Sequence, residues 1–434
     1  MVASKRLSSG HENHVVNIPD TDEKVLKTAV IYGANGAGKS NLFKAIDFLR
    51  NIALKPKKKN SGTGREAFCF CLEKQQTSDF DLQFTLGNKL YRYGIRVDDH
   101  KIVEEWLVHV VGVKEKPIYE RTTDDNGKVK VKGLKKSGEK LKALVTVGSP
   151  QNQSFLATVR IMLEPENYGI LGEIIEWFED SLTLIAPDTS FASLGQLLEK
   201  NPDFLEFASE FLKASSTGVN RLNVQKNEMT EDELRHFLPK ELVSRILEDF
   251  DSDDDGTALI IAQGKELLIE RTDQNHYFRF TIQAEHRHPE LEGVTLDLND
   301  ESDGTQRLLN LLPTLHHLKN SKNAVFFIDE IDRSMHPVLS KRFLEFFLNS
   351  CNGGQHQIIV TTHESNLLDL DLLRRDEIWF AEKDDTSATR LYSLTDFKIR
   401  NDLDVRKGYL QGRFGAIPFL GNLDYLLSEK EIRP

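Results

Sequence analysis

The chain has 434 residues, of which 39% are hydrophobic, so it can bury a sizeable core without disulfide or metal staples. Its 56 basic and 68 acidic side chains give a net charge of −12, which argues against a protein that coats nucleic acid with its whole surface. Three cysteines are too few for a disulfide framework. No apolar run reaches the roughly 18 residues of a membrane span, and the polar N-terminus lacks a signal peptide's apolar stretch. We expect a cytoplasmic protein of about two or three structural units with no membrane contact.

The first expected element is a short apolar strand in VLKTAVIYG, residues 25–33. A glycine-rich loop follows, and apolar residues at helical spacing then predict a helix over residues 40–53. The stretch 55–65 is rich in lysine, glycine and serine, and a solvated loop explains it more simply than phosphate contact. Alternation between residues 68 and 113 predicts antiparallel strands with a turn at Gly87-Asn88.

The rest of the chain alternates in character. A lysine-rich stretch at 124–142 predicts a hairpin or a mobile excursion, and residues 162–250 show helical spacing. Strands return near residue 258, and from Thr305 helices alternate with strands. The sequence therefore predicts an α/β protein with a β-rich lobe and a helical insertion. We expect three parts: an N-terminal part of the head over residues 1–155, a helical insertion over residues 156–250 and a C-terminal part of the head over residues 251–434.

The strongest chemical signal is the segment GANGAGKS, from Gly33 to Ser40, which fits the pattern G-x-x-x-x-G-K-[ST]. Glycines let successive backbone N–H groups turn toward phosphate oxygens, and the following helix adds the positive end of its dipole. Lys39 supplies a charge for the β- and γ-phosphates, and Ser40 can place its hydroxyl on Mg²⁺. A chance glycine-rich turn is disfavoured because a strand precedes the segment and a helix follows it.

The second signal is AVFFIDE, residues 324–330. An apolar run that ends in two carboxylates predicts a buried parallel strand with acidic groups at its carboxyl end. Asp329 would hold Mg²⁺ through water, and Glu330 would accept a proton from the attacking water or orient it. A strand that ends at an acidic surface turn is the alternative, and the phosphate loop disfavours it.

Two further segments carry candidate chemistry. Residues 301–305 (ESDGT) precede a helix; their hydroxyl and glycine residues could bind an anion, although local chemistry alone favours a plain N-cap. His363 ends the strand QIIVTT beside the expected acidic strand and could donate to a γ-phosphate or to water. Just after the acidic pair, Asp332 and Ser334 could cross a subunit interface or form an ordinary loop.

These elements in this order resemble the nucleotide-binding heads of ABC-type ATPases, in the RecF, SMC and OLD branch rather than the transporters. The resemblance implies a P-loop NTPase fold that uses ATP and Mg²⁺. It assigns nucleotide contacts to Gly33, Ala34, Asn35, Gly36, Ala37, Gly38, Lys39, Ser40 and Asn41. It further assigns a signature motif to Ser302, Asp303, Gly304 and Thr305, Mg²⁺ contacts to Ser40, Asp329 and Gln153, a D-loop to Asp332 and Ser334, and catalysis to Glu330 and the switch residue His363.

The wording of these motifs, such as YGANGAGKSNL and TTHESNLLD, is similar to a bacterial group of stand-alone defence ATPases. That group includes RloA, AbiL and the ATPase subunits of Septu, PARIS and certain retron systems. The resemblance implies a homodimer or higher even-numbered assembly, in which each head presents its signature turn to ATP on the other. It also implies a separate effector protein, a nuclease or a toxin, controlled during phage infection.

Two other functions stay open at this point. One is a RecF-like DNA-binding or repair ATPase without an effector, and the other is a nucleotide-dependent scaffold with negligible turnover. The lysine-rich stretches could touch DNA, but an exposed hairpin explains them more simply. The acidic run at 251–256 fails as a calcium loop because Ala262 stands where a bidentate carboxylate is needed. Cys69 and Cys71 lack a second pair for zinc.

Overall fold

The chain divides into two compact units. The first comprises residues 1–185, 322–331 and 351–434, and the second comprises residues 186–321 and 332–350. The computed structural model describes residues 1–5, 11–18, 23–58, 61–70, 77–189, 194–230, 232–233, 235, 243, 256–262, 265–272, 276–291, 293–320, 323–350, 354–399 and 404–417. Cys71, Cys351 and the acidic run 251–255 lie outside the described residues, whereas Cys69 is an exposed free thiol.

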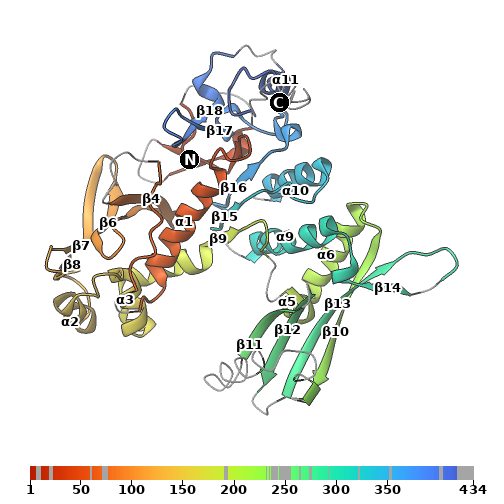
Figure 1. Cartoon of the computed structure of the whole chain (residues 1–434), viewed down its shortest axis with the longest axis horizontal. Coiled ribbons are helices and arrows are strands. Elements are labelled where there is room, and N and C mark those ends of the chain that lie inside the picture. The colour runs from red at the N-terminus through yellow and green to blue at the C-terminus, as the bar shows by residue number, and fades with distance from the viewer. Residues whose placement is uncertain are drawn as a thin grey trace, which may run out of the picture. The chain divides into compact units, whose positions relative to one another are not determined.

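A six-stranded sheet forms the centre of the first unit (Figure 1). Its order is β18 (Thr389–Ser393), β17 (Ile378–Lys383), β3 (Thr28–Tyr32), β16 (Gln357–Thr362), β15 (Val325–Ile328) and β9 (Leu182–Ile185). All neighbours pair in parallel except β17 and β18. The five residues of β3 are all buried, as expected for a parallel strand covered on both faces. The predicted α/β class with a parallel sheet is confirmed.

Helix α1 (Lys39–Leu54) begins directly after the glycine-rich loop. Its apolar side packs on the sheet, where the rings of Phe43 and Phe327 meet edge to face with centroids 5.5 Å apart. At its C-terminal half, Leu49, Ile52 and Ala53 join a core that extends into the β lobe. The helix therefore ties the phosphate loop to both layers of the first unit.

The β lobe is a five-stranded antiparallel meander. Its strands are β4 (Ser78–Leu86), β5 (Lys89–Val97), β6 (Ile102–Val111), β7 (Lys114–Thr123) and β8 (Val129–Gly133). Helices α2 (Glu139–Val147), α3 (Phe155–Met162) and α4 (Ile170–Glu176) follow it. The alternation read between residues 68 and 113 is confirmed by strands β4 to β6. The lysine-rich stretch forms β8 and α2 rather than a single hairpin.

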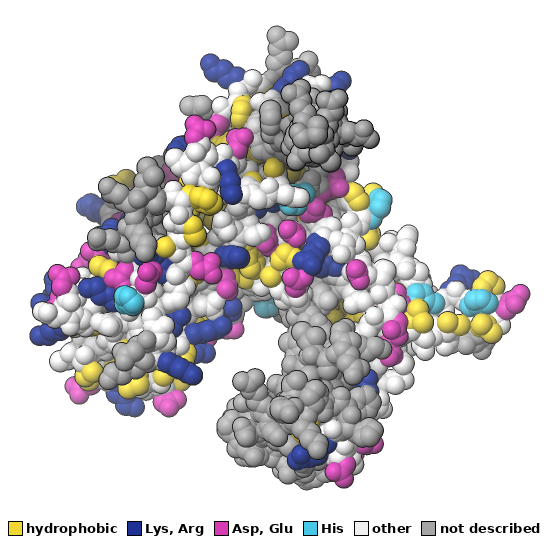
Figure 2. Space-filling view, in the orientation of Figure 1, with side chains coloured by type: hydrophobic (Ala, Val, Ile, Leu, Met, Phe, Trp, Pro, Cys, Tyr) yellow, Lys and Arg dark blue, Asp and Glu magenta, His cyan; other side chains and the backbone are white. Residues whose placement is uncertain are grey.

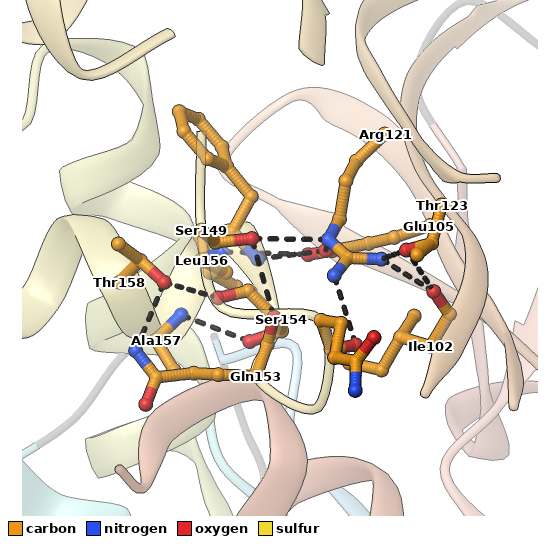
Figure 3. A network of polar contacts seen from close by, with 12 residues as sticks. Ile102, Glu105, Arg121, Thr123, Ser149, Gln153, Ser154, Leu156, Ala157 and Thr158 are labelled. Carbon is orange, nitrogen blue, oxygen red and sulfur yellow. Dashed lines mark hydrogen bonds and ion pairs between the residues drawn. The ribbon is translucent and has the colours of Figure 1, made fainter. Parts of the chain in front are cut away.

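A buried ion pair lies inside the β lobe, and its carboxylate also binds the start of α3 (Figure 3). Arg121 Nε lies 3.8 Å from Glu105 Oε2, and neither side chain is exposed to solvent. Glu105 accepts hydrogen bonds from the backbone N–H of Phe155 at 2.7 Å and from the Tyr119 hydroxyl at 2.6 Å. Burial lowers the pKa of Arg121 from its ordinary value, and Glu105 opposes this shift. The pair fixes where the chain leaves the β lobe.

The second unit contains a separate antiparallel sheet. Its order is β10 (Val219–Met229), β13 (His276–His286), β12 (Lys265–Thr272) and β11 (Gly256–Ala262), and β14 (Val294–Asp297) also pairs with β13. The helices of this unit are α5 (Leu194–Lys200), α6 (Pro202–Ala214), α9 (Asp303–Asn320) and α10 (Pro337–Ser350). The predicted helices over 305–319 and 338–349 therefore exist.

The unit boundaries differ from the expected divisions at residues 155 and 250. Residues 156–250 are not a purely helical insertion, because β9 belongs to the central sheet and β10 pairs with β13. Helices α3 and α4 also pack into the first unit's core. The remaining elements are β1 (Val15–Asn17), β2 (Lys24–Leu26), α11 (Val405–Leu410), the π-helix η3 (Trp177–Ser181) and the 3₁₀ helices η1 (Glu12–His14), η2 (Pro165–Asn167), η4 (Leu298–Asp300), η5 (Ser365–Leu367), η6 (Arg375–Glu377) and η7 (Leu394–Asp396).

Within the described ranges, no helix combines the length and the apolar character that crossing a membrane requires.

Candidate functional site

The candidate site lies in the first unit, at the carboxyl ends of three neighbouring parallel strands. The glycine-rich loop follows β3, His363 follows β16, and Asp329 and Glu330 follow β15. Parallel α/β sheets place their ligands at this edge. Residues from three distant parts of the sequence therefore meet within one unit, as the sequence predicts.

The phosphate loop depends on glycine at two positions. A side chain at Gly33 would place its Cβ 2.6 Å from the carbonyl oxygen of Ala381 in β17. Gly38 has φ +97°, in the left-handed region, and a Cβ there would collide with the hydroxyl of Thr389 in β18. That hydroxyl donates to the Ala37 carbonyl at 3.0 Å. The β17–β18 hairpin thus packs against the phosphate loop and restrains it. The sequence did not predict this contact.

Lys39 is held in the loop by its own backbone and by His363. Its Nζ donates to the carbonyl oxygens of Gly33 at 2.8 Å and of Ala34 at 3.4 Å. The same Nζ lies 3.0 Å from His363 Nε2 and 3.3 Å from Nδ1. Lys39 is 5% exposed, whereas His363 is exposed. Because an ammonium group can only donate, the imidazole faces it as an acceptor.

The acidic pair is organised by Thr361, the penultimate residue of β16. The Thr361 hydroxyl donates to Asp329 Oδ1 at 2.5 Å and accepts from the backbone N–H of Glu330 at 2.8 Å. Asp329 is 3% exposed, and Glu330 has a φ of 49°, in the left-handed region. The sequence analysis assigned no function to Thr361. A hydroxyl residue at the end of the strand that neighbours an acidic strand is the signal that could have identified it.

The end of β16 therefore connects the two halves of the site. Thr361 binds Asp329 on one side, and His363, two residues later, contacts Lys39 on the other. Successive strands lie about 4.8 Å apart, so the loop after β3 and the acidic pair after β15 are separated by about 10 Å with β16 between them. That spacing suits a triphosphate with an associated cation.

The oxygen donors of the site fit Mg²⁺. Ser40 supplies a hydroxyl in the first turn of α1, and Asp329 supplies a carboxylate with one oxygen held by Thr361. Mg²⁺ is typically bound by one or two protein oxygens together with substrate phosphates and water.

The structure does not bring Gln153 to this site; Figure 3 shows its amide at Thr158 of α3 instead. Its amide accepts from the backbone N–H of Lys57 at 3.0 Å and donates to Thr158 at 2.9 Å. The neighbouring Ser154 donates to the carbonyl of Ile52, which lies about 18 Å along α1 from Ser40 at 1.5 Å per residue. The expectation that Gln153 contacts Mg²⁺ does not fit this placement, since its amide already joins the end of α1 to α3.

The predicted signature residues form the start of α9 in the second unit. Ser302 Oγ accepts from the backbone N–H of Thr305 at 3.2 Å and lies 2.9 Å from its hydroxyl, so Ser302 caps the helix. Ser302 and Asp303 are exposed. A Cβ at Gly304 would stand 2.7 Å from the Ser334 carbonyl oxygen. The structure thus brings the signature turn and the expected D-loop together.

The signature turn is also tied to the sheet of its own unit. Glu301, directly before Ser302, lies with Oε1 2.5 Å from His286 Nε2 at the end of β13. The Asp332 carbonyl accepts from the N–H of Met335, which turns the D-loop toward α10. The predicted site residues therefore fall into two groups, one in each unit.

Comparisons with known proteins place these residues in a family. A family model described as "AAA domain, putative AbiEii toxin, Type IV TA system" matches residues 29–134 and 160–369, more than half of the chain. A search of curated proteins finds none that matches.

Solved structures with a similar backbone fold include three SMC heads. One is bound to the C-winged helix domain of ScpA, with 14% identity, a TM-score of 0.38 and coverage of 87% of this chain and 96% of that one. The head domain from Thermotoga maritima has 10% identity, a TM-score of 0.33 and coverage of 89% and 97%. The Pyrococcus furiosus head domain with an extended coiled coil has 12% identity, a TM-score of 0.33 and coverage of 92% and 97%.

Replacing Thr361 with valine tests the link between the two halves of the site. The variant keeps the shape of the side chain but removes the hydroxyl that orients Asp329 and holds Glu330. We expect Mg²⁺-dependent ATP hydrolysis to fall about 10- to 100-fold, the usual cost of losing a residue that orients a metal ligand. A steady-state phosphate-release assay over a Mg²⁺ titration measures this.

Thr28→Val is the matched control, because Thr28 is a buried threonine at the opposite end of neighbouring β3. Its rate should stay within about twofold of the wild type. Equal hydrolysis by Thr361→Val and the wild type at every Mg²⁺ concentration would contradict the assigned role.

Proposed function

The chain belongs to the family described as "AAA domain, putative AbiEii toxin, Type IV TA system", and from this membership we propose that it is an ATPase that uses Mg²⁺. The P-loop NTPase fold of this family supports nucleotide binding and hydrolysis. The observation that carries the proposal is the position of β16, whose end contacts Lys39 through His363 and Asp329 through Thr361.

Each residue of the site has a task that its chemistry suits. The backbone N–H groups of the glycine-rich loop and the Lys39 ammonium bind the β- and γ-phosphates, which replace the carbonyl oxygens that Lys39 contacts here. Ser40 and Asp329 would hold Mg²⁺, which would neutralise charge on the phosphates. The Glu330 carboxylate accepts a proton from the attacking water, and His363 donates to the terminal phosphate.

A pair of variants separates binding from turnover. Lys39→Ala should lose ATP binding, because it removes the buried cation of the loop. Glu330→Gln keeps the shape of the site but cannot accept a proton, so it should bind ATP normally while hydrolysis falls by about 10²-fold or more. Isothermal titration with ATP and a phosphate-release assay measure the two properties. Wild-type affinity in Lys39→Ala, or wild-type turnover in Glu330→Gln, would refute the assignment.

We further propose that two copies share each ATP, with the signature turn of one copy completing the site of the other. Ser302 and Asp303 are exposed at the start of α9, where the helix dipole is positive and backbone N–H groups point outward. Such a turn can bind the terminal phosphate of a nucleotide held on another molecule. ATP would then favour the closed assembly, and hydrolysis would release it.

A bulky residue at the signature turn tests shared binding. Ser302→Trp should leave ATP binding by the single chain intact but block association driven by ATP. Ser302→Thr is the control, since it keeps the hydroxyl that caps α9. Mass photometry with ATP, in the Glu330→Gln background, measures the assembly. ATP-driven assembly of the Trp variant at wild-type strength would argue against a signature role.

The assembly controls a separate effector, a nuclease or toxin, in anti-phage defence. The description of the family, which names the AbiEii toxin, and the likeness of the motifs to RloA and AbiL support this proposal. A RecF-like DNA-binding or repair ATPase without an effector is the alternative.

Phage plating on cells that carry the chain with its neighbouring genes separates these two functions. Protection should disappear both in Lys39→Ala and when the neighbouring gene is deleted. DNA-stimulated ATP hydrolysis, together with protection that survives the deletion, would favour the RecF-like alternative.

A further inference from the structure

The edge of the β lobe carries an unusual concentration of positive charge. Residues 128–142 contain seven lysines and one acidic residue, Glu139, for a local charge of +6 in a chain whose total is −12. We call this surface the lysine ridge, and it consists of Lys128, Lys130, Lys132, Lys135, Lys136, Lys140 and Lys142. All seven side chains are exposed. Figure 2 shows dark blue side chains where Figure 1 labels β7, β8 and α2.

The fold directs these lysines outward. Strand β8 is the last strand of its sheet, and its Val129 and Val131 pack on the core, so the alternate residues Lys130 and Lys132 face solvent. In α2, Leu141 and Leu144 are buried in the same core, and the two lysines of the helix flank them. The ridge therefore follows an edge strand, the turn after it and the next helix.

The positive charge of the ridge is largely uncompensated. In the parts of the chain that the structure describes, none of the seven ammonium groups forms an ion pair, while the nearby Asp125 pairs with Lys101 at 3.7 Å. Acidic residues near the ridge are Glu120, opposite Lys132 in the register of β7 and β8, Glu139 in α2, and Asp124, whose carboxylate accepts from the backbone N–H of Lys128 at 2.9 Å. Seven exposed lysines with so little neutralisation repel one another. A bound polyanion would relieve this repulsion.

We propose that the lysine ridge binds the phosphate backbone of duplex nucleic acid without reading its sequence. Protein–protein interfaces are depleted in lysine and enriched in aromatic residues and arginine, which disfavours a protein partner. Residues 128–142 contain no aromatic side chain on which an unpaired base could stack, which disfavours single strands. Strand β8 is about 17 Å long, and a duplex presents about ten phosphates over that length.

The test is fluorescence anisotropy of a labelled 30-base-pair duplex with the full chain, over a range of NaCl concentrations and without nucleotide. Because counterions are released, log Kd should vary with log salt with a slope magnitude of about 4 or more. The variant Lys130→Gln, Lys132→Gln, Lys135→Gln, Lys136→Gln should reduce that magnitude by about 3 and weaken binding at least about tenfold. Since ATP is absent, failure here would leave the proposed ATPase function untouched.

A matched control removes the same charge elsewhere. The variant Lys89→Gln, Lys213→Gln, Lys398→Gln, Lys407→Gln changes four other exposed lysines and should keep the wild-type slope. Equal loss in both variants would overturn the ridge as the site, as would a wild-type slope magnitude below about 2. Tighter binding to a 30-nucleotide single strand, or to phosphatidylserine vesicles, than to the duplex would also overturn the proposal.

Discussion

The pairing of β16 between β3 and β15 is the constraint on which the whole site depends. Its register sets Val360 beside Val30 and Ile328, and Thr361 therefore emerges next to the acidic pair. A shift of one residue would turn Thr361 to the opposite face of the sheet, because successive side chains of a strand alternate. Asp329 would then be a buried carboxylate without the donor that holds it, which is costly. The apolar run of β16 and the chemistry of the site thus specify the same register.

The phosphate loop is similarly fixed before any ligand arrives. Lys39 is a buried cation, and its hydrogen bonds to the loop carbonyls and its contact with His363 offset the loss of water. Thr389 and the backbone of Ala381 press on the loop from the β17–β18 hairpin. Groups that are already oriented lose little entropy when they bind, so this rigidity favours binding of a polyphosphate.

Much of the central sheet could be predicted from the sequence, whereas the tertiary contacts that hold the site residues in place could not. Strands β3, β15 and β16 are continuous apolar runs that end in glycine, acidic or threonine residues, and such runs identify buried parallel strands. Strand β10 (VNRLNVQKNEM) was missed, since its polar residues belong to an exposed edge strand and hide the alternation. Gln153 was misplaced because a glutamine in a loop carries no sign of which helix its amide will join. Thr361 and Thr389 act through tertiary contacts across more than 30 residues of sequence, which no local pattern encodes.

The distribution of charge adds a constraint that composition alone conceals. Residues 128–142, which contain the lysine ridge and Glu139, carry +6, so the rest of the chain carries −18. At physiological salt, charges act over about 8 Å, so a polyanion near the ridge feels the ridge and little of the distant acidic surface. A polyanion that approaches an acidic part of the surface meets repulsion. An acidic total therefore sharpens the selectivity of a local basic surface, and it orients the approach of nucleic acid toward the β lobe.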